Sequence, residues 1–314
     1  MEYLQSNKAV RDYVDILQQA NYDNELVQSL WADKLTENGI TQDVNENDIL
    51  PEKIVGKIQA NVRDSVVLSK FNLTFNIEAG QLVIDKSVDT AKGHKKLANK
   101  SVQTGALVKR TILPEAIYKL QQLDHMTFLK GGALVTWVLE ELPKHVVRVL
   151  EQAILVGGVK NTDDTPFTAV YPILTDELAT QVAADSIFNG IIDGVSAVDG
   201  DSSSRYIFIN PSDYATLLKA GDALSVAILT GNVNLGATIV PTDIVAKADN
   251  PKFMVVNTDN YLVGFAGSGV ETLSAFAIMN NAQVVESRAY VAGSLTKQGG
   301  ASIVTVTLPT TPGV

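Results

Sequence analysis

Very few residues of this 314-residue chain have the types and spacing that catalysis requires. The three histidines, His94, His125 and His145, are scattered, and none lies in an HExxH pattern or at the spacing of a known Ser/His/Asp triad. Surface or hydrogen-bonded histidines are the ordinary alternative. Cysteine is absent, which excludes disulfides and thiolate metal sites but identifies no compartment. The sequence therefore predicts no enzyme, no catalytic residue, no metal site and no bound cofactor.

Two further patterns have structural explanations that are simpler than chemical ones. Glu140, Glu141 and Glu151 could form a carboxylate pair, but adjacent residues do not share a helix face, so we expect a solvated face. The glycines of Gly264–Gly269 follow the order G-x-x-G-x-G and not the dinucleotide-binding order G-x-G-x-x-G. At these glycines we expect a turn beside a strand.

Charge is distributed unevenly along the chain, whose formal net charge is −10. Residues 1–50 contain ten acidic and three basic residues, whereas residues 78–112 contain seven basic and three acidic residues. Such segments could meet within a subunit or between subunits. The basic surface is smaller than that of a dedicated nucleic-acid binder. Four lysines crowd one loop without interleaved aromatic residues, which favours a subunit contact over phosphate binding: Lys92, Lys95, Lys96 and Lys100.

The first third of the chain divides into an acidic helical part and an extended part. Apolar residues at helical spacing predict one or two amphipathic helices in residues 1–36. We expect this leader, residues 1–46, to pack its apolar faces, which include Trp31, against a subunit surface. A short helix is predicted at Pro51–Val62 and an extended segment at Val66–Ile77.

Residues 79–112 predict a hairpin, in which two short apolar strands flank a long polar loop. Pro114 is placed to open a helix that ends near Leu123. A long helix is predicted from Leu134 to about Val156, and Pro143 should kink it or divide it in two.

The remainder is predicted to be mixed and then rich in strands. Thr175–Asn189 has the pattern of an amphipathic helix, and Ile207–Ile209 that of a buried strand. Ser212 or Asp213 can cap a helix after that strand. From Ala237 onward several short apolar runs indicate strands.

Composition supports a folded chain with an aliphatic core, since hydrophobic residues make up 46% and aromatic residues only 6%. No run approaches the roughly 18 apolar residues that a membrane helix needs. The polar start of the chain lacks the apolar core of a signal peptide. We therefore expect no membrane partner.

The order of several motifs resembles the major capsid protein of tailed bacteriophages, which has the Hong Kong 97-like fold. The long helix ends on a glycine pair, and a loop then leads to Pro166–Ile173. Ile207–Leu218 matches the family's strand, Asn-Pro, Asp and helix, and Gly236–Thr242 matches its glycine, short strand and Pro-Thr. Glu286 and Arg288 match an acid and an arginine before the last strands. Three features depart from the family's pattern. Gly157-Gly158-Val159 stands in place of the frequent Gly-Asp-Gly, and a proline usual before the Pro-Thr strand is replaced near Thr238. Pro143 within the long helix is the third.

The resemblance implies an α+β architecture built around a long spine helix. Its expected parts are a leader (1–46), an N-terminal arm (47–77), an extended hairpin loop (78–112), a peripheral domain (113–164 and 277–314) with the spine helix, and an axial domain (165–276).

The resemblance also implies a structural role in the virion. The chain would assemble with itself as hexamers and pentamers, in the host cytoplasm, into an icosahedral shell around double-stranded DNA, without sequence-specific binding. Portal, scaffold or decoration proteins are further expected partners. Two alternatives stay open, namely an encapsulin-type nanocompartment shell and an α/β enzyme or binding protein. Enzyme cargo would favour the first, and a convergent polar pocket the second.

Overall fold

The computed structural model describes residues 65–86, 106–124, 132–231, 236–246, 252–267, 269–277 and 282–307, together with eight positions of the leader. Those eight positions are helical, as expected for the leader: residues 12, 15, 16, 19, 30, 33, 34 and 37. The chain divides into two compact units. Unit 1 comprises Met1–Ser65, Ala116–Val149 and Ser268–Tyr290, and unit 2 comprises Val66–Glu115, Leu150–Gly267 and Val291–Val314.

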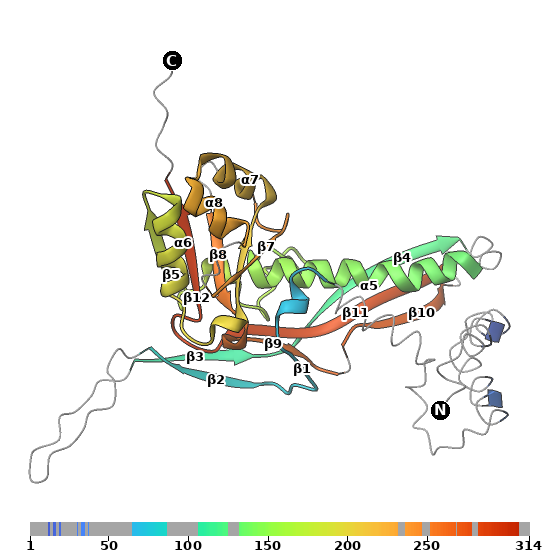
Figure 1. Cartoon of the computed structure of the whole chain (residues 1–314). Coiled ribbons are helices and arrows are strands. Elements are labelled where there is room, and N and C mark those ends of the chain that lie inside the picture. Colours follow the sequence, from blue (N-terminus) through green and yellow to red (C-terminus); the bar gives the residue numbers. More distant parts are fainter. Residues whose placement is uncertain are drawn as a thin grey trace, which may run out of the picture. The chain divides into compact units, whose positions relative to one another are not determined.

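Unit 2 contains a five-stranded mixed sheet of order β5-β12-β8-β6-β7 (Figure 1). The central strand β8 (Lys252–Asn257) pairs antiparallel with both β6 and β12. The outer strands β7 and β5 run parallel to β6 and β12 respectively. The bounds of the four are β5 Thr180–Ala184, β6 Arg205–Ile209, β7 Thr238–Pro241 and β12 Ala301–Val306.

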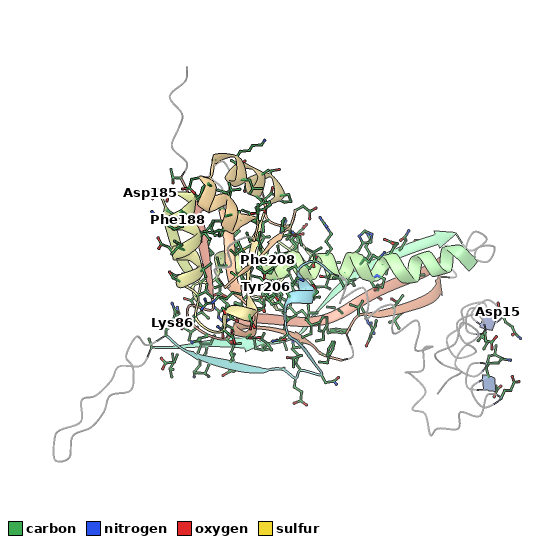
Figure 2. The ribbon with its side chains drawn as sticks, in the orientation of Figure 1. Asp15, Lys86, Asp185, Phe188, Tyr206 and Phe208 are labelled. Carbon is green, nitrogen blue, oxygen red and sulfur yellow. The ribbon has the colours of Figure 1, made fainter. Side chains whose placement is uncertain are left out.

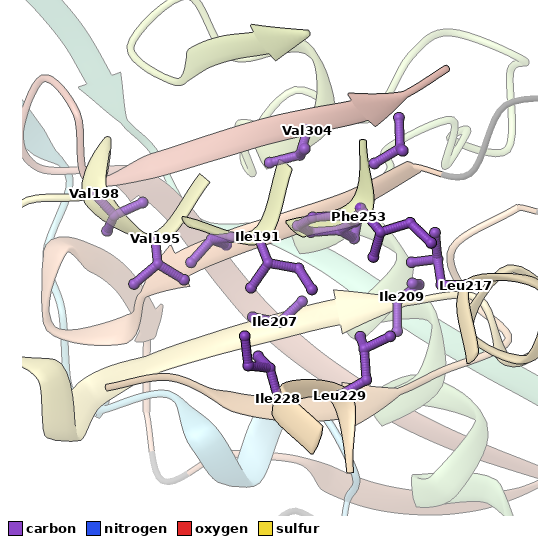
Figure 3. Packing of buried hydrophobic residues seen from close by; sticks show 13 residues of the cluster. Ile191, Val195, Val198, Ile207, Ile209, Leu217, Ile228, Leu229, Phe253 and Val304 are labelled. Atoms are coloured by element: carbon purple, nitrogen blue, oxygen red, sulfur yellow. The ribbon is translucent and has the colours of Figure 1, made fainter. Parts of the chain in front are cut away.

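Three helices bury one face of this sheet (Figure 3). They are α6 (Ile187–Ser196), α7 (Pro211–Ala220) and α8 (Ala223–Leu229). Strand alternation directs Ile207 and Ile209 of β6 into this cluster. Gly194 of α6 lies so close to β12 that a Cβ there would be 2.5 Å from Val304 Cγ2. Small residues on α6 therefore let the helix approach the sheet.

On the opposite face of the sheet, aromatic residues pack against β6. Phe208 of β6 stacks on Phe71 with ring centroids 5.9 Å apart, and Phe71 meets Tyr261 edge-on at 5.5 Å. Phe71 follows a short 3₁₀ turn, η1 (Leu68–Lys70). The sheet is therefore buried on both faces, which fits the nearly continuous apolar runs of β6 and β8.

A second sheet has the order β1-β9-β11-β10, with β4 also paired to β11. In unit 2, β1 (Leu73–Phe75) pairs parallel with β9 (Tyr261–Phe265), and β9 pairs antiparallel with residues 291–295 of β11. In unit 1, residues 282–288 of β11 pair antiparallel with β10. The remaining bounds are β4 Glu115–Asp124, β10 Glu271–Ala277 and β11 Ala282–Leu295.

The long helix is confirmed as α5, Gly132–Leu155. Pro143 lies inside one continuous helix, so the division into two helices was wrong. The helix ends where Gly157 and Gly158 adopt φ of 75° and 73°, the left-handed region that glycine enters without steric cost.

Two predicted helices were wrong. Pro114–Leu123 is the strand β4, because pairing with β11 supplies its hydrogen bonds and directs Ile117 to the buried face. Within Thr175–Asn189 the chain forms β5 and only then α6, whose N-terminus is capped by Ser186. The cap of α7 is Asn210 and not Ser212 or Asp213, since its side chain accepts from Ser212 N.

Other expectations are confirmed or differ in part. The predicted hairpin, the strand at Ile207–Ile209 and the strand-rich end are present. Val66–Ile77 contains the turn η1 before the short strand β1. The expected division placed β12 with residues 113–164, whereas β12 is hydrogen-bonded between β5 and β8 in unit 2. The helix expected at Pro51–Val62 lies outside the described residues.

Candidate functional site: the hairpin and its buried anchor

The feature of unit 2 with the clearest functional potential is the hairpin of β2 (Gly80–Asp85) and β3 (Leu107–Ile112) (Figure 1). The strands pair antiparallel, with Leu82 opposite Arg110 and Val83 opposite Lys109. Directly opposed residues point to the same side of a ribbon, so the hairpin has two distinct faces.

One face of the hairpin is packed against the rest of unit 2. Ile84, Arg110 and Ile112 on this face are at most 6% exposed. The opposite face carries six exposed residues: Gln81, Val83, Asp85, Leu107, Lys109 and Thr111. Val83 and Leu107 are 53% and 62% exposed, unusually open for aliphatic strand residues. We call these six residues the open face.

The packed face is anchored by a buried ion pair between Arg110 and Asp176. Arg110 Nη1 donates to Asp176 Oδ2 at 2.7 Å and Nη2 donates to Asp176 Oδ1 at 2.5 Å, the two-pronged geometry that suits a guanidinium. The side chains are 5% and 0% exposed. Charges removed from water in this way are stable only when fully partnered.

Further contacts complete the environment of the guanidinium. Arg110 Nη1 also donates to Ser294 Oγ at 2.9 Å, and the group lies 4.5 Å from the centre of the Tyr171 ring. Asp176 Oδ1 also accepts from Leu178 N at 2.8 Å. Burial by itself would lower the pKa of Arg110, but the hydrogen bond and charge of Asp176 raise that pKa above its usual value. The guanidinium of Arg110 therefore stays charged across the physiological range.

The anchor continues through Tyr261, whose hydroxyl donates to the carbonyl of Tyr171 at 2.7 Å. Burial raises the pKa of Tyr261 well above its usual value, and the nearby Asp176 carboxylate raises it further, against an opposing effect of Arg110. The base of the hairpin is thus tied to β9, to β11 and to the segment before β5.

A second ion pair lies at the outer end of the described hairpin. Lys86, labelled in Figure 2, donates to Glu177 at 2.9 Å. This hydrogen bond and the lysine charge lower the pKa of the Glu177 carboxyl. Glu177 is 61% exposed, so solvent screens this pair and it contributes far less than the Arg110 anchor.

The segment that precedes the hairpin is held by Glu151 of α5. Its carboxylate accepts from the backbone N–H groups of Val67 and Leu68 at 3.0 and 3.1 Å. Glu151 is only 6% exposed, so the expected solvated face is wrong at this position. Glu141 behaves as expected and pairs with Lys144 at 2.6 Å on the surface.

The described cavity of unit 2 is apolar. The cavity between α6, α7, α8 and the sheet is lined by aliphatic residues, Phe253 and Tyr214. The Tyr214 hydroxyl already donates to Leu229 O at 2.7 Å. No group of three acidic or histidine residues in the described part of the chain is arranged to hold a metal ion. None of its helices has both the length and the hydropathy to cross a membrane.

The structure brings together few of the residues singled out from sequence. Lys92, Lys95, Lys96, Lys100 and Trp31 lie outside the described residues. Gly267 and Gly269 adopt φ of 125° and 121°, which confirms a turn after β9. Arg110, Asp176 and Ser294 were missed. Arg110 left one signal, since it occupies an inward position of an alternating strand between Val108 and Ile112.

Comparison with known proteins shows a resemblance to phage capsid proteins. No family model matches the chain. Over 246 residues the chain is 26% identical to the capsid proteins of Lactococcus phages p2 and SK1, covering 74% of this chain. The chain spans about three fifths (60%) of the length of these curated relatives.

Solved structures show the same resemblance at the level of the fold. The capsid of a native GTA particle matches with a TM-score of 0.59 and 12% identity, over 85% of this chain and 94% of that one. A chain of Mycobacterium phage Adephagia matches with a TM-score of 0.55 and 15% identity, over 79% and 91%. The mixed α/β fold of this chain is therefore that of capsid proteins, and the resemblance drawn from sequence is confirmed.

Proposed function

We propose that this chain is the major capsid protein of a phage head. It has the Hong Kong 97-like fold and assembles with itself as hexamers and pentamers into an icosahedral shell that encloses double-stranded DNA. One observation carries the proposal: the fold matches a shell-forming chain over 85% of its own length and 94% of that chain.

The described elements have natural counterparts in such a shell. The β2–β3 hairpin corresponds to the extended loop, α5 to the spine helix, and the five-stranded sheet with α6, α7 and α8 to the axial domain. β12 joins that axial sheet. Residues 1–46 and 47–77 correspond to the leader and arm.

The open face of the hairpin is the surface that most needs a neighbour. A two-stranded ribbon is marginally stable by itself in water. Here one face is anchored, while Val83 and Leu107 on the other are exposed. A neighbouring subunit that covers the hairpin would bury both side chains. The loop lysines Lys92, Lys95, Lys96 and Lys100 then contact carboxylates of that neighbour, and Trp31 packs at a subunit contact.

The remaining parts of the proposal concern the setting. The shell forms in the host cytoplasm and becomes part of the virion, with portal, scaffold or decoration proteins as further partners. DNA is enclosed and not read, which agrees with a net charge of −10 and a confined basic segment.

A protein nanocompartment is the second candidate. A virus-like particle from Pyrococcus furiosus matches with a TM-score of 0.53, over 81% of this chain and 98% of that chain. An enzyme cargo that co-purifies with the particles would favour this candidate, whereas nuclease-protected DNA in particles from an infected host would favour the phage head.

Electron microscopy of the purified full-length chain, combined with light scattering, tests assembly. We expect closed shells or rings of five and six subunits. A compact monomer that persists across protein concentration and salt would overturn the proposal.

A further inference from the structure

Two of the points at which the chain passes from unit 1 into unit 2 lie close to Glu151 in the fold. The N-terminal part of the chain enters unit 2 after Ser65, and the helix α5 enters it after Val149. Glu151 therefore lies just inside unit 2 on α5, next to the second of these crossings.

The carboxylate of Glu151 reaches the other crossing. Its Oε1 atom accepts from Val67 N at 3.0 Å and from Leu68 N at 3.1 Å, although these residues are 84 and 83 positions away in sequence. Val67 and Leu68 are 0% exposed, whereas Val66, one residue earlier, is 56% exposed. We call this contact the Glu151 grip. It acts on the first buried residues of the chain after Ser65.

The turn that follows the grip needs an acceptor of this kind. Within η1, Lys70 N donates to Val67 O and Phe71 N donates to Leu68 O, so the hydrogen bonds of the turn begin with later amides. The first amides of such a turn require an acceptor from elsewhere. Buried backbone N–H groups are nearly always paired, and an ionised acceptor forms the stronger bonds. The Glu151 grip therefore stabilises the start of η1.

Apolar packing holds the segment on the far side of the grip. Phe71 is 5% exposed and contacts the rings of Phe208 and Tyr261. The strand β1 then pairs with β9. These contacts fix the chain beyond Leu68, whereas the Glu151 grip is the polar contact that fixes its first buried residues to α5.

We propose that the Glu151 grip is a conformational device that makes the two crossings move as one. This inference rests on the proposed assembly. Rings of five and six subunits hold neighbouring copies at different angles, so the curvature of a shell depends on how freely the parts of each copy turn. With the grip closed, the chain at Val67 and the helix α5 move together. With the grip open, the chain at Val67 turns independently, and the shells that form vary in size.

Two substitutions separate the reach of the side chain from its charge. Glu151→Gln loses the charge but keeps an oxygen that can accept from both amides, so it should behave as the wild type. Glu151→Asp keeps the charge but is one methylene shorter, so it should open the grip. Glu151→Met, which leaves no charge to bury, replaces the aspartate variant if circular dichroism shows that the latter does not fold.

Hydrogen exchange resolved to single residues on unassembled protein measures the grip, and electron microscopy of the full-length protein measures assembly. The amides of Val67 and Leu68 should exchange about tenfold faster or more in Glu151→Asp than in the wild type, because they lose their acceptor. Shells of this variant should have a broader distribution of diameters. The wild type and Glu151→Gln should share one narrow distribution.

Ser302→Ala is the matched control. The hydroxyl of Ser302, which is 0% exposed, donates to Gly194 O at 2.7 Å, so this change removes another buried contact from a side chain to the backbone of unit 2. It should lower the stability and leave the diameters narrow. If it broadens the diameters as Glu151→Asp does, the cause is a general loss of stability and the inference is wrong.

Two further results would overturn the inference. If Val67 and Leu68 exchange in Glu151→Asp as they do in the wild type, the carboxylate does not hold them. If they exchange faster and the shells stay uniform, the grip does not control assembly, and the proposed function stands. If the wild type forms no shells at all, the proposed function fails and the inference fails with it.

Discussion

Replacing Arg110 by methionine tests whether the buried ion pair holds the hairpin against the rest of unit 2. Methionine keeps a long side chain but removes the charge. The side chain of Asp176 is 0% exposed. Of its described donors, it would then keep only the backbone N–H of Leu178. Ser294 would lose a donor at 2.9 Å.

The cost follows from leaving a buried carboxylate without its counter-charge. Breaking a buried pair by removal of one partner costs about 3–5 kcal/mol. If the hairpin opens locally, its amide exchange should accelerate by about a hundredfold to a few thousandfold, since about 1.4 kcal/mol corresponds to a tenfold change.

Hydrogen exchange with mass spectrometry on unassembled protein measures this directly. Peptides that cover Leu107–Ile112 should exchange much faster in Arg110→Met, while peptides from β8 serve as an internal reference. Lys109→Met is the matched control, because Lys109 is the adjacent residue on the exposed face and should leave exchange unchanged.

A double variant distinguishes an ion pair from simple packing. Asp176→Asn removes the second charge and keeps an oxygen that can accept from Leu178 N. Arg110→Met with Asp176→Asn should therefore be more stable than Arg110→Met alone by about 1–3 kcal/mol. Less than fivefold acceleration in the single variant, or strict additivity in the double variant, would refute the role of the anchor.

Four further predictions concern the glycine pair, two ionisable groups and the loop lysines. Gly157→Ala should destabilise unit 2 more than Gly158→Ala in urea titrations. Both glycines have positive φ, which costs an alanine about 1–2 kcal/mol. Only at Gly157 would the added Cβ also lie 2.5 Å from Pro172 Cγ. The raised pKa of Tyr261 contributes stability that is complete below the unfolded-state pKa of about 10 and is lost as pH rises above that value. The stability advantage of the wild type over Tyr261→Phe should therefore shrink above pH ~10. A constant difference in the free energy of unfolding would contradict this. The lowered pKa of Glu177 contributes stability present above its usual value and lost as pH falls below it, so exchange at the outer end of the hairpin should rise in acid, and Lys86→Met should abolish that rise. Replacing Lys92, Lys95, Lys96 and Lys100 by Glu should impair assembly in electron micrographs while circular dichroism shows a folded chain; normal shells would contradict their role in subunit contact.

Local patterns predicted the elements whose hydrogen bonds lie within one segment or across one turn. The apolar spacing of Leu134–Val156 and the glycine pair after it determine a helix and its end, because both depend on neighbours within a few residues. The hairpin was predictable for the same reason, since two short apolar strands flank one polar loop. The order of motifs was also enough to indicate a capsid-like fold.

Partners far away in the chain decided the rest. Residues 115–124 and 180–184 carry helix-compatible local patterns, yet they are strands because β11 and β12, more than 100 residues downstream, supply their backbone partners. The site was hidden for the same reason. Asp176 and Ser294 lie 66 and 184 residues from Arg110 in sequence, and the three meet only when the hairpin packs on β11. The sequence by itself determined the long helix, the hairpin and the apolar and charged segments. Only the tertiary structure decided which charges are buried and paired, because burial and pairing depend on contacts that no local pattern encodes.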